Sequence, residues 1–287
     1  MTGRSRLDLR RYRVQGHRGA RGLAPENTVP SFRAAIEAGA TGIELDVRLT
    51  GDGQVVVWHD PTLQAEKCLM TGVDYTDARV DELTLAQLRT VDVGSRTLAA
   101  FPQQQAHPGA RIPTLAEVFD ACSSHDLWWT VEVKVDPEDP AEVESRPRLV
   151  DGVLLAIHEA GLAQRSLVHS FDWGVLDRAR ELDPGLLRSA LAVVGHTYAP
   201  GSPWVRSVRW EDHGWDLASA AAAVGAHVVS PHHLTCDAEF VDRAHALGLA
   251  VVPWTVNEEP DLVRVVEAGV DALVTDYPAR AVPLLEG

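Results

Sequence analysis

Acidic side chains alternate with aliphatic residues in two short apolar segments of the sequence. Glu44 and Asp46 lie two positions apart in the first segment, and Glu132 and Lys134 have the same spacing in the second. Because residues two apart in a strand point to the same side, each pair is expected to project from one face. Burying such carboxylates is unfavourable unless positive charge compensates them.

Three carboxylates from neighbouring strands would supply oxygen ligands for a cation. A hard divalent cation such as Ca²⁺ or Mg²⁺ takes oxygen ligands and keeps positions open for water and substrate. We therefore interpret Glu44, Asp46 and Glu132 as metal ligands. The alternative is that they form an ion-pair network with Arg18 and Lys134 and bind no metal. Two same-face pairs in succession favour the cation, and the choice between Ca²⁺ and Mg²⁺ stays open.

His17 and His59 also fall at the ends of short apolar segments. His17 directly precedes Arg18, and His59 directly precedes Asp60. A histidine taken alone is more often a surface or hydrogen-bonded residue. Two of them near an acidic cluster suit cleavage of a phosphodiester, in which one group takes a proton from the nucleophile and another protonates the leaving oxygen. Arg18 would stabilise charge on the phosphate oxygens.

Glu26 and Asn27 stand directly before a segment with helical periodicity. Asn27 or Thr28 is a candidate N-cap for a helix that ends at Gly39. Alternatively, Glu26 and Asn27 orient the groups that hold the metal or the substrate. Both interpretations stay open at this point.

Short apolar runs that alternate with helix-length segments must position these residues. The candidate strands are residues 14–16, 43–47, 128–135, 166–169, 188–193, 226–229, 250–254 and 272–275, and the clearest helical segments are 28–38, 149–160, 173–182, 237–247 and 258–268. Strands that alternate with helices pair in parallel, and eight such units favour a closed (β/α)8 TIM barrel. Catalytic groups of such barrels lie at the carboxyl ends of the strands, where His17, Glu44, Glu132 and Trp254 fall.

Residues 51–113 are too long for a single connection between two strands. They contain a hairpin-like GDGQVVVWHD, in which glycines supply the turn and residues 55–58 a short strand, and a helix-like segment over residues 84–91. We predict that they form an insertion after the second strand. With no repeat or low-complexity linker in the sequence, we expect a single domain over about residues 14–280.

Composition narrows the choice of partners. The chain has 287 residues, 45% of them hydrophobic and 23% charged, and a formal net charge of -15. Such a surface repels nucleic acid and anionic lipid, so the expected partner is a small-molecule substrate, without nucleic acid and without stable membrane association. Oligomeric state stays open.

The N-terminus and the cysteines bear on the cellular compartment. The first 14 residues are basic but lead into QGHRGARG rather than an apolar stretch, so no secretory signal is expected. Cys68, Cys122 and Cys236 are too scattered for a disulfide framework or a paired-cysteine metal site. We expect a cytoplasmic protein.

Several longer blocks of sequence resemble one known family. HRGARGLAPENTVPSFRAAIEAGATGIELDVRLTGDGQVVVWHDPTL is similar to the opening motif of the glycerophosphodiester phosphodiesterases, and IPTLAEVF, VEVK, HSFDW, PWTVN and GVDALVTDYP follow in the expected order. The resemblance covers residues 14–278. It implies a (β/α)8 barrel that uses a divalent cation to hydrolyse glycerophosphodiesters to glycerol 3-phosphate and an alcohol.

The resemblance also implies roles for particular residues. It assigns metal binding to Glu44, Asp46 and Glu132, acid/base catalysis to His17 and His59, contacts with phosphate and metal-bound oxygens to Arg18 and Lys134, and a wall of the glycerol pocket to Trp254. In the family's mechanism a glycerol hydroxyl attacks phosphorus, and water opens the resulting cyclic phosphate. Which histidine is the acid and which the base stays open.

The chain departs from the family pattern after HDPTL. Residues 64–68, QAEKC, replace an arginine-threonine stretch of many members, which affects the alcohol side of the pocket. Cys68 resembles a residue that some relatives pair in a disulfide, but the sequence identifies no partner for it. The alcohol released by this chain is therefore left open.

Two other functions remain as alternatives. A related lipid-cleaving barrel, such as a phospholipase or a sphingomyelinase-D-like lyase, would need an apolar or basic interfacial loop, and residues 51–113 offer none. A catalytically silent barrel is disfavoured because each motif position carries a competent side chain. His232 and His233 either line the barrel mouth or are ordinary loop residues, and residues 196–215 are expected to pack as a loop.

Overall fold

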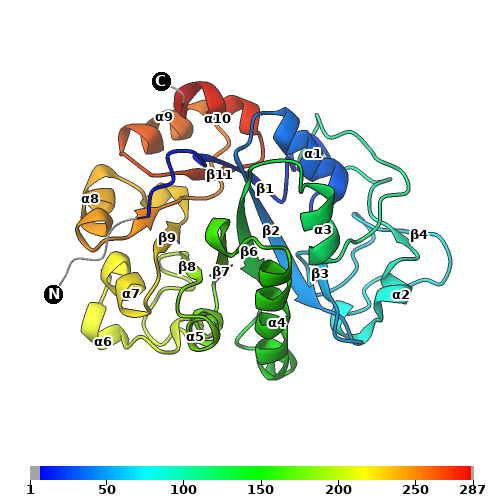
Figure 1. Ribbon diagram of the computed structural model, residues 1–287, viewed down its shortest axis with the longest axis horizontal. Helices are drawn as coiled ribbons and strands as arrows, with labels where there is room; N and C mark the ends of the chain where they lie inside the picture. Colours follow the sequence, from blue (N-terminus) through cyan, green and yellow to red (C-terminus); the bar gives the residue numbers. More distant parts are fainter. Residues whose placement is uncertain (1–6, 286–287) are drawn as a thin grey trace.

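The computed structural model describes residues 7–285, and within this range eight parallel strands form the centre of the molecule (Figure 1). In spatial order they are β10 (Ala250–Val251), β9 (Val228–Pro231), β8 (Leu187–Ala192), β7 (Ser166–Ser170), β6 (Trp128–Val133), β2 (Gly42–Leu49), β1 (Val14–His17) and β11 (Leu273–Thr275). The two ends of this sheet meet beyond β10, where Val274 N donates to Pro253 O over 3.0 Å and Val256 N donates to Val274 O over 2.9 Å. The predicted TIM barrel is confirmed, with one strand in each of the eight predicted segments.

Helices surround these strands (Figure 1). They are α1 (Val29–Glu37), α3 (Leu115–Ala121), α4 (Pro140–Glu159), α5 (Trp173–Leu182), α6 (Trp210–His213), α7 (Leu217–Ala223), α8 (Ala238–Ala246), α9 (Glu259–Glu267) and α10 (Pro278–Leu285). Short polar side chains cap several of their N-termini, as where Asp172 accepts a hydrogen bond from Gly174 N over 3.0 Å at the start of α5. Within residues 7–285, no helix combines the length and apolar composition needed to cross a membrane.

The start predicted for α4 is wrong by nine residues. Helical periodicity predicted a beginning at residue 149. Pro147, two residues earlier, is a residue type that usually interrupts a helix interior. The helix instead begins at Pro140, after Asp139 accepts a hydrogen bond from Ala141 N over 2.9 Å. Pro147 is thus accommodated inside a 20-residue helix.

The lower half of the barrel interior, at the amino ends of the strands, is mainly apolar, and its buried Thr130 and Gln15 satisfy one another through a hydrogen bond of 2.7 Å from Thr130 Oγ1 to Gln15 Oε1. Side chains that are almost fully buried there are Leu9, Trp128, Leu167, Val228, Ala250, Val252, Ala272 and Val274. The segment before β1 covers this end, since Leu9 packs into the cluster and the Tyr12 ring lies 5.6 Å from that of Trp128. Residues 1–6 of the basic N-terminal stretch lie outside the described range.

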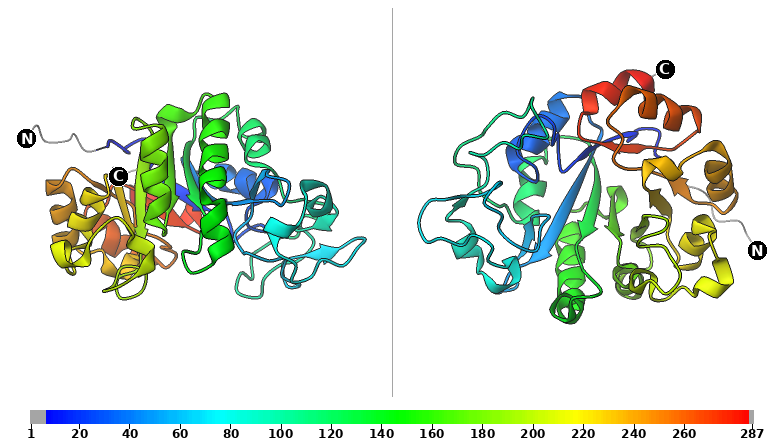
Figure 2. Two further views of the ribbon diagram at one scale, coloured as in Figure 1. Left: turned by 90° about the horizontal axis from the view of Figure 1, so that it is seen from below. Right: turned by 180° about the vertical axis from the view of Figure 1, so that it is seen from behind.

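Residues 51–113 lie between β2 and β6 and project to one side of the barrel (cyan in Figures 1 and 2). Their first strand, β3 (Val55–Val57), pairs antiparallel with β2, as the hairpin motif predicted. The rest holds β4 (Leu69–Met70), the 3-10 turn η1 (Val80–Glu82), α2 (Leu85–Leu88) and β5 (Val91–Asp92), which pairs with β4. A separate apolar cluster that includes Trp58, Leu63 and the buried, free Cys68 holds this segment together.

Candidate active site

Strand register brings the predicted site residues into adjoining rows at the carboxyl end of the barrel. His17 on β1 is the neighbour of Glu44 on β2. Asp46 on β2 is the neighbour of Glu132 on β6, which in turn adjoins His169 on β7. Neighbours in parallel register point to the same face, so these side chains converge on the barrel mouth.

The three carboxylates are buried and close together. Glu44, Asp46 and Glu132 are 2%, 0% and 8% exposed, and one oxygen of each lies within 4.8 Å of the others. Glu44 Oε1 and Asp46 Oδ1 have no hydrogen-bond partner among the described residues. Burial, together with the charges of Asp46 and Glu132, raises the pKa of Glu44 well above its usual range. The oxygens that accept no hydrogen bond suit a hard cation.

Arg18 and Lys134 supply part of the compensating positive charge. Arg18 N donates to Glu44 Oε2 over 2.9 Å, and Arg18 Nε lies 3.1 Å from Asp46 Oδ2. Lys134 Nζ donates to Glu132 Oε1 over 2.6 Å and lies 3.4 Å from Asp46 Oδ1. Although burial opposes ionisation, Arg18 and Lys134 hold the pKa of Asp46 well below its usual range. The ion-pair network considered as an alternative therefore exists, but it leaves two carboxylate oxygens without hydrogen bonds.

Glu26 and Asn27 both contact these groups. Asn27 Nδ2 donates to Asp46 Oδ2 over 2.8 Å, and its Oδ1 accepts from Asp46 N over 3.3 Å. Thr28, rather than Asn27, caps α1 by accepting from Ser31 N. Glu26 Oε1 accepts from Arg18 Nη1 over 2.9 Å. Asn27 thus orients Asp46, and Glu26 positions the guanidinium of Arg18.

His17 is held in place by Asp276, which directly follows β11, and by Asn257 in the loop between β10 and α9. Its Nδ1 lies 2.7 Å from Asp276 Oδ1. Asn257 fixes this carboxylate, because its Nδ2 donates to Asp276 Oδ2 over 2.6 Å and its Oδ1 accepts from Asp276 N over 2.9 Å. A carboxylate can only accept, so the proton of a neutral His17 ring belongs on Nδ1 and leaves the Nε2 lone pair available.

Neighbouring residues of the segment 51–113 orient His59 in the same way. Its Nδ1 lies 2.8 Å from Asp60 Oδ1, and Lys67 Nζ donates to Asp60 Oδ2 over 2.5 Å and to Glu26 Oε1 over 2.9 Å. Burial and the nearby charge of Lys134 lower the pKa of His59 to about 4. Both histidines therefore direct Nδ1 to a carboxylate and leave Nε2 for chemistry.

Sequence reasoning missed several residues of this constellation. His169 is 3% exposed, its Nδ1 has no hydrogen-bond partner among residues 7–285, and burial followed by the charge of Lys134 lowers its pKa to about 3. It ends a predicted strand, so the rule applied to His17 would have found it. Asp60, Lys67 and Asn257 lie in loops, where no periodicity marks which side chains point toward the barrel.

Aromatic side chains form one side of the mouth. Trp254 Nε1 donates to Ser230 O over 3.0 Å, and its ring lies 5.4 Å from Phe171 and 5.5 Å from His232. His232 therefore lies beside a predicted site residue, whereas Arg264 contacts the neighbouring His233 over 3.1 Å. Glu132, Lys134, Phe171 and Trp204 are among the residues that line a cavity of about 330 Å³.

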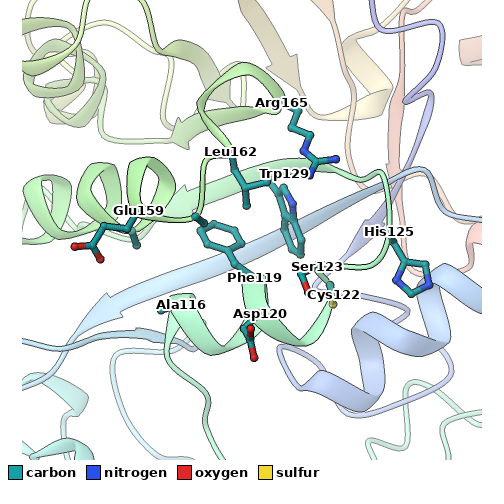
Figure 3. A pocket seen from close by; sticks show the side chains of 12 residues that line it. Ala116, Phe119, Asp120, Cys122, Ser123, His125, Trp129, Glu159, Leu162 and Arg165 are labelled. Carbon is teal, nitrogen blue, oxygen red and sulfur yellow. The ribbon is translucent and has the colours of Figure 1, made fainter.

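A second cavity, of about 350 Å³, lies outside the barrel between α3 and α4 (Figure 3). Phe119, Trp129 and Leu162 lie together in it, with Phe119 and Trp129 edge to face at 5.0 Å. Trp129 packs against the helices, whereas Trp128 belongs to the cluster inside the barrel. This cavity holds none of the residues that converge at the barrel mouth.

A family model described as "Glycerophosphoryl diester phosphodiesterase family" matches residues 17–280. The chain belongs to this family. A glycerophosphodiester phosphodiesterase of Caldanaerobacter subterraneus subsp. tengcongensis is 31% identical over 277 residues, which cover 95% of this chain and 97% of the relative. One of Bacillus subtilis is 28% identical over 264 residues, covering 91% and 82%.

Solved structures of similar proteins agree with this family assignment. A glycerophosphoryl diester phosphodiesterase family structure from Silicibacter pomeroyi matches with a TM-score of 0.82 at 33% identity, covering 100% of this chain and 94% of the other. An Oleispira antarctica phosphodiesterase, solved in complex with sn-glycerol-3-phosphate, matches with a TM-score of 0.73 at 24% identity, covering 96% and 97%. The second likeness supports the fold alone.

Proposed function

We propose that this member of the glycerophosphoryl diester phosphodiesterase family hydrolyses glycerophosphodiesters to glycerol 3-phosphate and an alcohol, with a divalent cation and two histidines. One observation carries the proposal. His17 and His59, each oriented by a carboxylate, share the barrel mouth with a buried carboxylate cluster in which two oxygens accept no hydrogen bond from the described residues. The names of the relatives support the substrate class.

Glu44, Asp46 and Glu132 would hold the cation, which is Ca²⁺ or Mg²⁺. Their donor set is all oxygen, and Glu44 Oε1 and Asp46 Oδ1 are buried without hydrogen bonds, so these residues fit a hard cation. When bound, the cation would neutralise charge on the phosphoryl oxygens. Arg18 and Lys134 would bind the phosphate from the same side, and Trp254 would form a wall of the glycerol pocket.

The two histidines would carry the protons. One Nε2 accepts the proton of a glycerol hydroxyl as its oxygen bonds to phosphorus, and the other histidine protonates the alcohol oxygen as its bond to phosphorus breaks. Water then opens the cyclic phosphate with the roles of the histidines exchanged. Asp60 and Asp276 stabilise whichever ring is protonated, and Asn27 and Glu26 keep Asp46 and Arg18 in position.

An assay of glycerol 3-phosphate release from several glycerophosphodiesters tests this proposal. We expect activity to disappear with a chelator and to return when Ca²⁺ or Mg²⁺ is restored. Activity that survives exhaustive chelation would contradict the metal assignment. An analogue without the vicinal hydroxyl should be cleaved much more slowly, and an equal rate would rule out the cyclic phosphate.

We further propose that about residues 14–280 act as one domain in which residues 51–113 are an insertion. His59 and Lys67 come from this segment and contact the rest of the chain, because His59 O accepts a hydrogen bond from Arg48 Nε on β2 and Lys67 Nζ donates to Glu26 Oε1, which supports treating the two parts as one catalytic unit. A single unfolding transition, followed both by tryptophan fluorescence and by loss of activity, is expected. Two separate transitions would contradict it.

A further inference from the structure

The row of side chains that contains Asp46 and Glu132 continues onto two further strands. Glu132 on β6 is the neighbour of His169 on β7, and His169 is the neighbour of Ser189 on β8. Leu167, two residues before His169, belongs to the apolar cluster inside the barrel. Because residues two apart in a strand share a face, His169 also points into the barrel interior. It therefore lies beside the carboxylate cluster, one strand beyond Glu132.

His169 is buried without a hydrogen bond. It is 3% exposed, which is within the range of 0 to 8% for the three carboxylates, so it is as close to the barrel mouth as they are. Within residues 7–285, neither of its ring nitrogens forms a hydrogen bond, and Nδ1 is fully enclosed. Burying an imidazole without partners is unfavourable, and proteins keep such a group mainly where something else satisfies it.

The ionisable groups around His169 already have partners of their own. Those whose charges act on it are Lys134, Asp46 and His17. Lys134 Nζ lies 3.4 Å from Asp46 Oδ1, and His17 Nδ1 lies 2.7 Å from Asp276 Oδ1. Because no side chain of the described range bonds to the ring of His169, a partner for this ring has to come from outside the chain.

The chemistry of the row indicates which part of a substrate this partner is. Asp46 and Glu132, when ionised, can only accept hydrogen bonds, and they repel a phosphoryl group. A neutral imidazole has one N–H donor, and phosphoryl oxygens are strong acceptors. Lys134, which would bind the phosphate, is two residues beyond Glu132 on the same face of β6. A phosphoryl group at Lys134 would therefore lie on the side of the mouth where His169 is.

We propose that His169 is a third phosphate-binding residue, which donates a hydrogen bond from Nε2 to a non-bridging phosphoryl oxygen beside the contacts of Arg18 and Lys134. This inference rests on the function proposed above. Nε2 is the donor because Nδ1 is enclosed. The phosphoryl oxygen is present in the substrate and in glycerol 3-phosphate, so the contact should strengthen the binding of both.

The test compares His169→Leu, which keeps apolar volume but no hydrogen bond, with His169→Gln, which keeps an amide donor near the position of Nε2. Calorimetry with Ca²⁺ or Mg²⁺ present measures the binding of glycerol 3-phosphate and orthophosphate, and of glycerol by displacement of glycerol 3-phosphate. His169→Leu should weaken both phosphate ligands roughly 10- to 100-fold, as expected for a hydrogen bond to a charged group, and leave glycerol unchanged. His169→Gln should recover most of this affinity. Glutamine does not exchange protons, so recovery excludes an acid/base role.

Ser166→Ala is the matched control on the same strand. Ser166 is also fully buried, and its Oγ has no hydrogen-bond partner among the described residues, but it precedes Leu167 and lies on the opposite face of β7. It should leave all three affinities unchanged. If His169→Leu does not fold, His169→Asn takes its place, because the shorter amide does not reach the position of Nε2 and the same loss is expected.

The inference is overturned if His169→Leu weakens only glycerol, weakens none of the ligands, or has no larger effect than Ser166→Ala. It is also overturned if the wild type binds neither phosphate ligand. In each case, hydrolysis of glycerophosphodiesters by the wild type would leave the proposed function intact. If the wild type hydrolyses none of them with Ca²⁺ or Mg²⁺ present, the proposed function fails instead, so the two failures are distinguishable.

Discussion

The two halves of the barrel interior use the same strands for opposite purposes. β6 begins with Trp128 in the apolar lower half and carries Glu132 in the upper half, and both residues are buried. Likewise, β7 carries Leu167 below and His169 above. Burial alone therefore does not distinguish the two halves. The two halves differ in the chemistry of their buried side chains: those of the lower half are stabilised mainly by apolar contacts, whereas those of the upper half need charged partners.

This difference implies that the lower half stabilises the barrel and the upper half serves chemistry. Apolar burial contributes roughly 25 cal/mol per Å² of surface removed from water. Buried ion pairs, by contrast, contribute little net stability because desolvation offsets their attraction. Removing a proton-transfer histidine from the upper half should thus affect catalysis more than stability, and removing an apolar side chain from the lower half should do the reverse.

The largest effect is expected in the upper half, from loss of a proton-transfer group. His17→Ala and His59→Ala should each lower kcat for glycerol 3-phosphate release about 10²- to 10⁴-fold, the usual contribution of general acid–base catalysis. The free energy of unfolding should change little, as measured with urea. His125→Ala, at an exposed position beside the cavity between α3 and α4, is the control. Full activity in both variants would remove the histidines from the mechanism.

The lower half should respond in the opposite way. Leu167 is 2% exposed inside the barrel, so Leu167→Ala should lower the free energy of unfolding by about 2–5 kcal/mol through lost burial and a residual cavity. Below its unfolding transition the variant should keep nearly the wild-type kcat. Leu155→Ala, at a 58% exposed position of α4, should change stability far less. A large loss of kcat in folded Leu167→Ala would show that the two halves are coupled.

An intermediate effect is expected when one charge of the upper half is removed. Burial, with Asp46 and Glu132, raises the pKa of Glu44, so the stability tied to its protonation is complete below its unfolded pKa and is lost as pH rises through its folded pKa. Glu44→Gln stays neutral throughout. In chelator, the free energy of unfolding of wild type relative to Glu44→Gln should therefore fall as pH rises.

Restoring the cation should raise the free energy of unfolding of the wild type above that of Glu44→Gln at high pH. Ca²⁺ or Mg²⁺ at about a hundred times its dissociation constant adds about 2.7 kcal/mol to the wild type, and much less to a variant that lacks a ligand. Urea unfolding across pH, with and without the metal, measures both effects. Glu159→Gln at an exposed position of α4 serves as control. If, in chelator, the wild type instead becomes more stable relative to Glu44→Gln as pH rises, the raised pKa of Glu44 would be contradicted.

The sequence predicted the upper half better where strands supply it than where loops do. Alternation along β2 and β6 placed Glu44, Asp46 and Glu132 on the inner face, and strand register accounts for their convergence. Asn257 and Lys67 have no such periodicity, because a loop residue reaches the site only through the three-dimensional path of the backbone. The contacts that orient His17 and His59 through Nδ1 could therefore be identified only from the structure.

Helix boundaries show the same limit. The ends of α1 and α5 agree with their predicted segments to within a residue or two, because polar caps mark both beginnings and Gly39 follows the end of α1. The beginning of α4 was missed: the helix starts at Pro140 and continues through Pro147, a residue type that usually interrupts a helix interior. Local signals were sufficient wherever tertiary structure did not override them.

The smallest effect is expected from Lys67, which joins residues 51–113 to the upper half. Its ammonium bridges Asp60, which orients His59, and Glu26, which positions Arg18. Lys67→Met should lower kcat about tenfold, the lower end of what is lost with groups that orient ligands, with a smaller change in KM. Steady-state kinetics on each variant measure this split.

Lys67→Arg keeps the charge at the same place and should restore much of the lost kcat, although a guanidinium does not reproduce the geometry of an ammonium. Recovery of kcat in Lys67→Arg would show that the charge of Lys67 acts on His59, and that the loss in Lys67→Met is not caused by poorer packing alone. If Lys67→Met lowers only the free energy of unfolding and leaves kcat unchanged, Lys67 supports the fold of residues 51–113 alone. The chemistry of the upper half would then depend on the barrel strands and His59, without the contacts that Lys67 makes behind them.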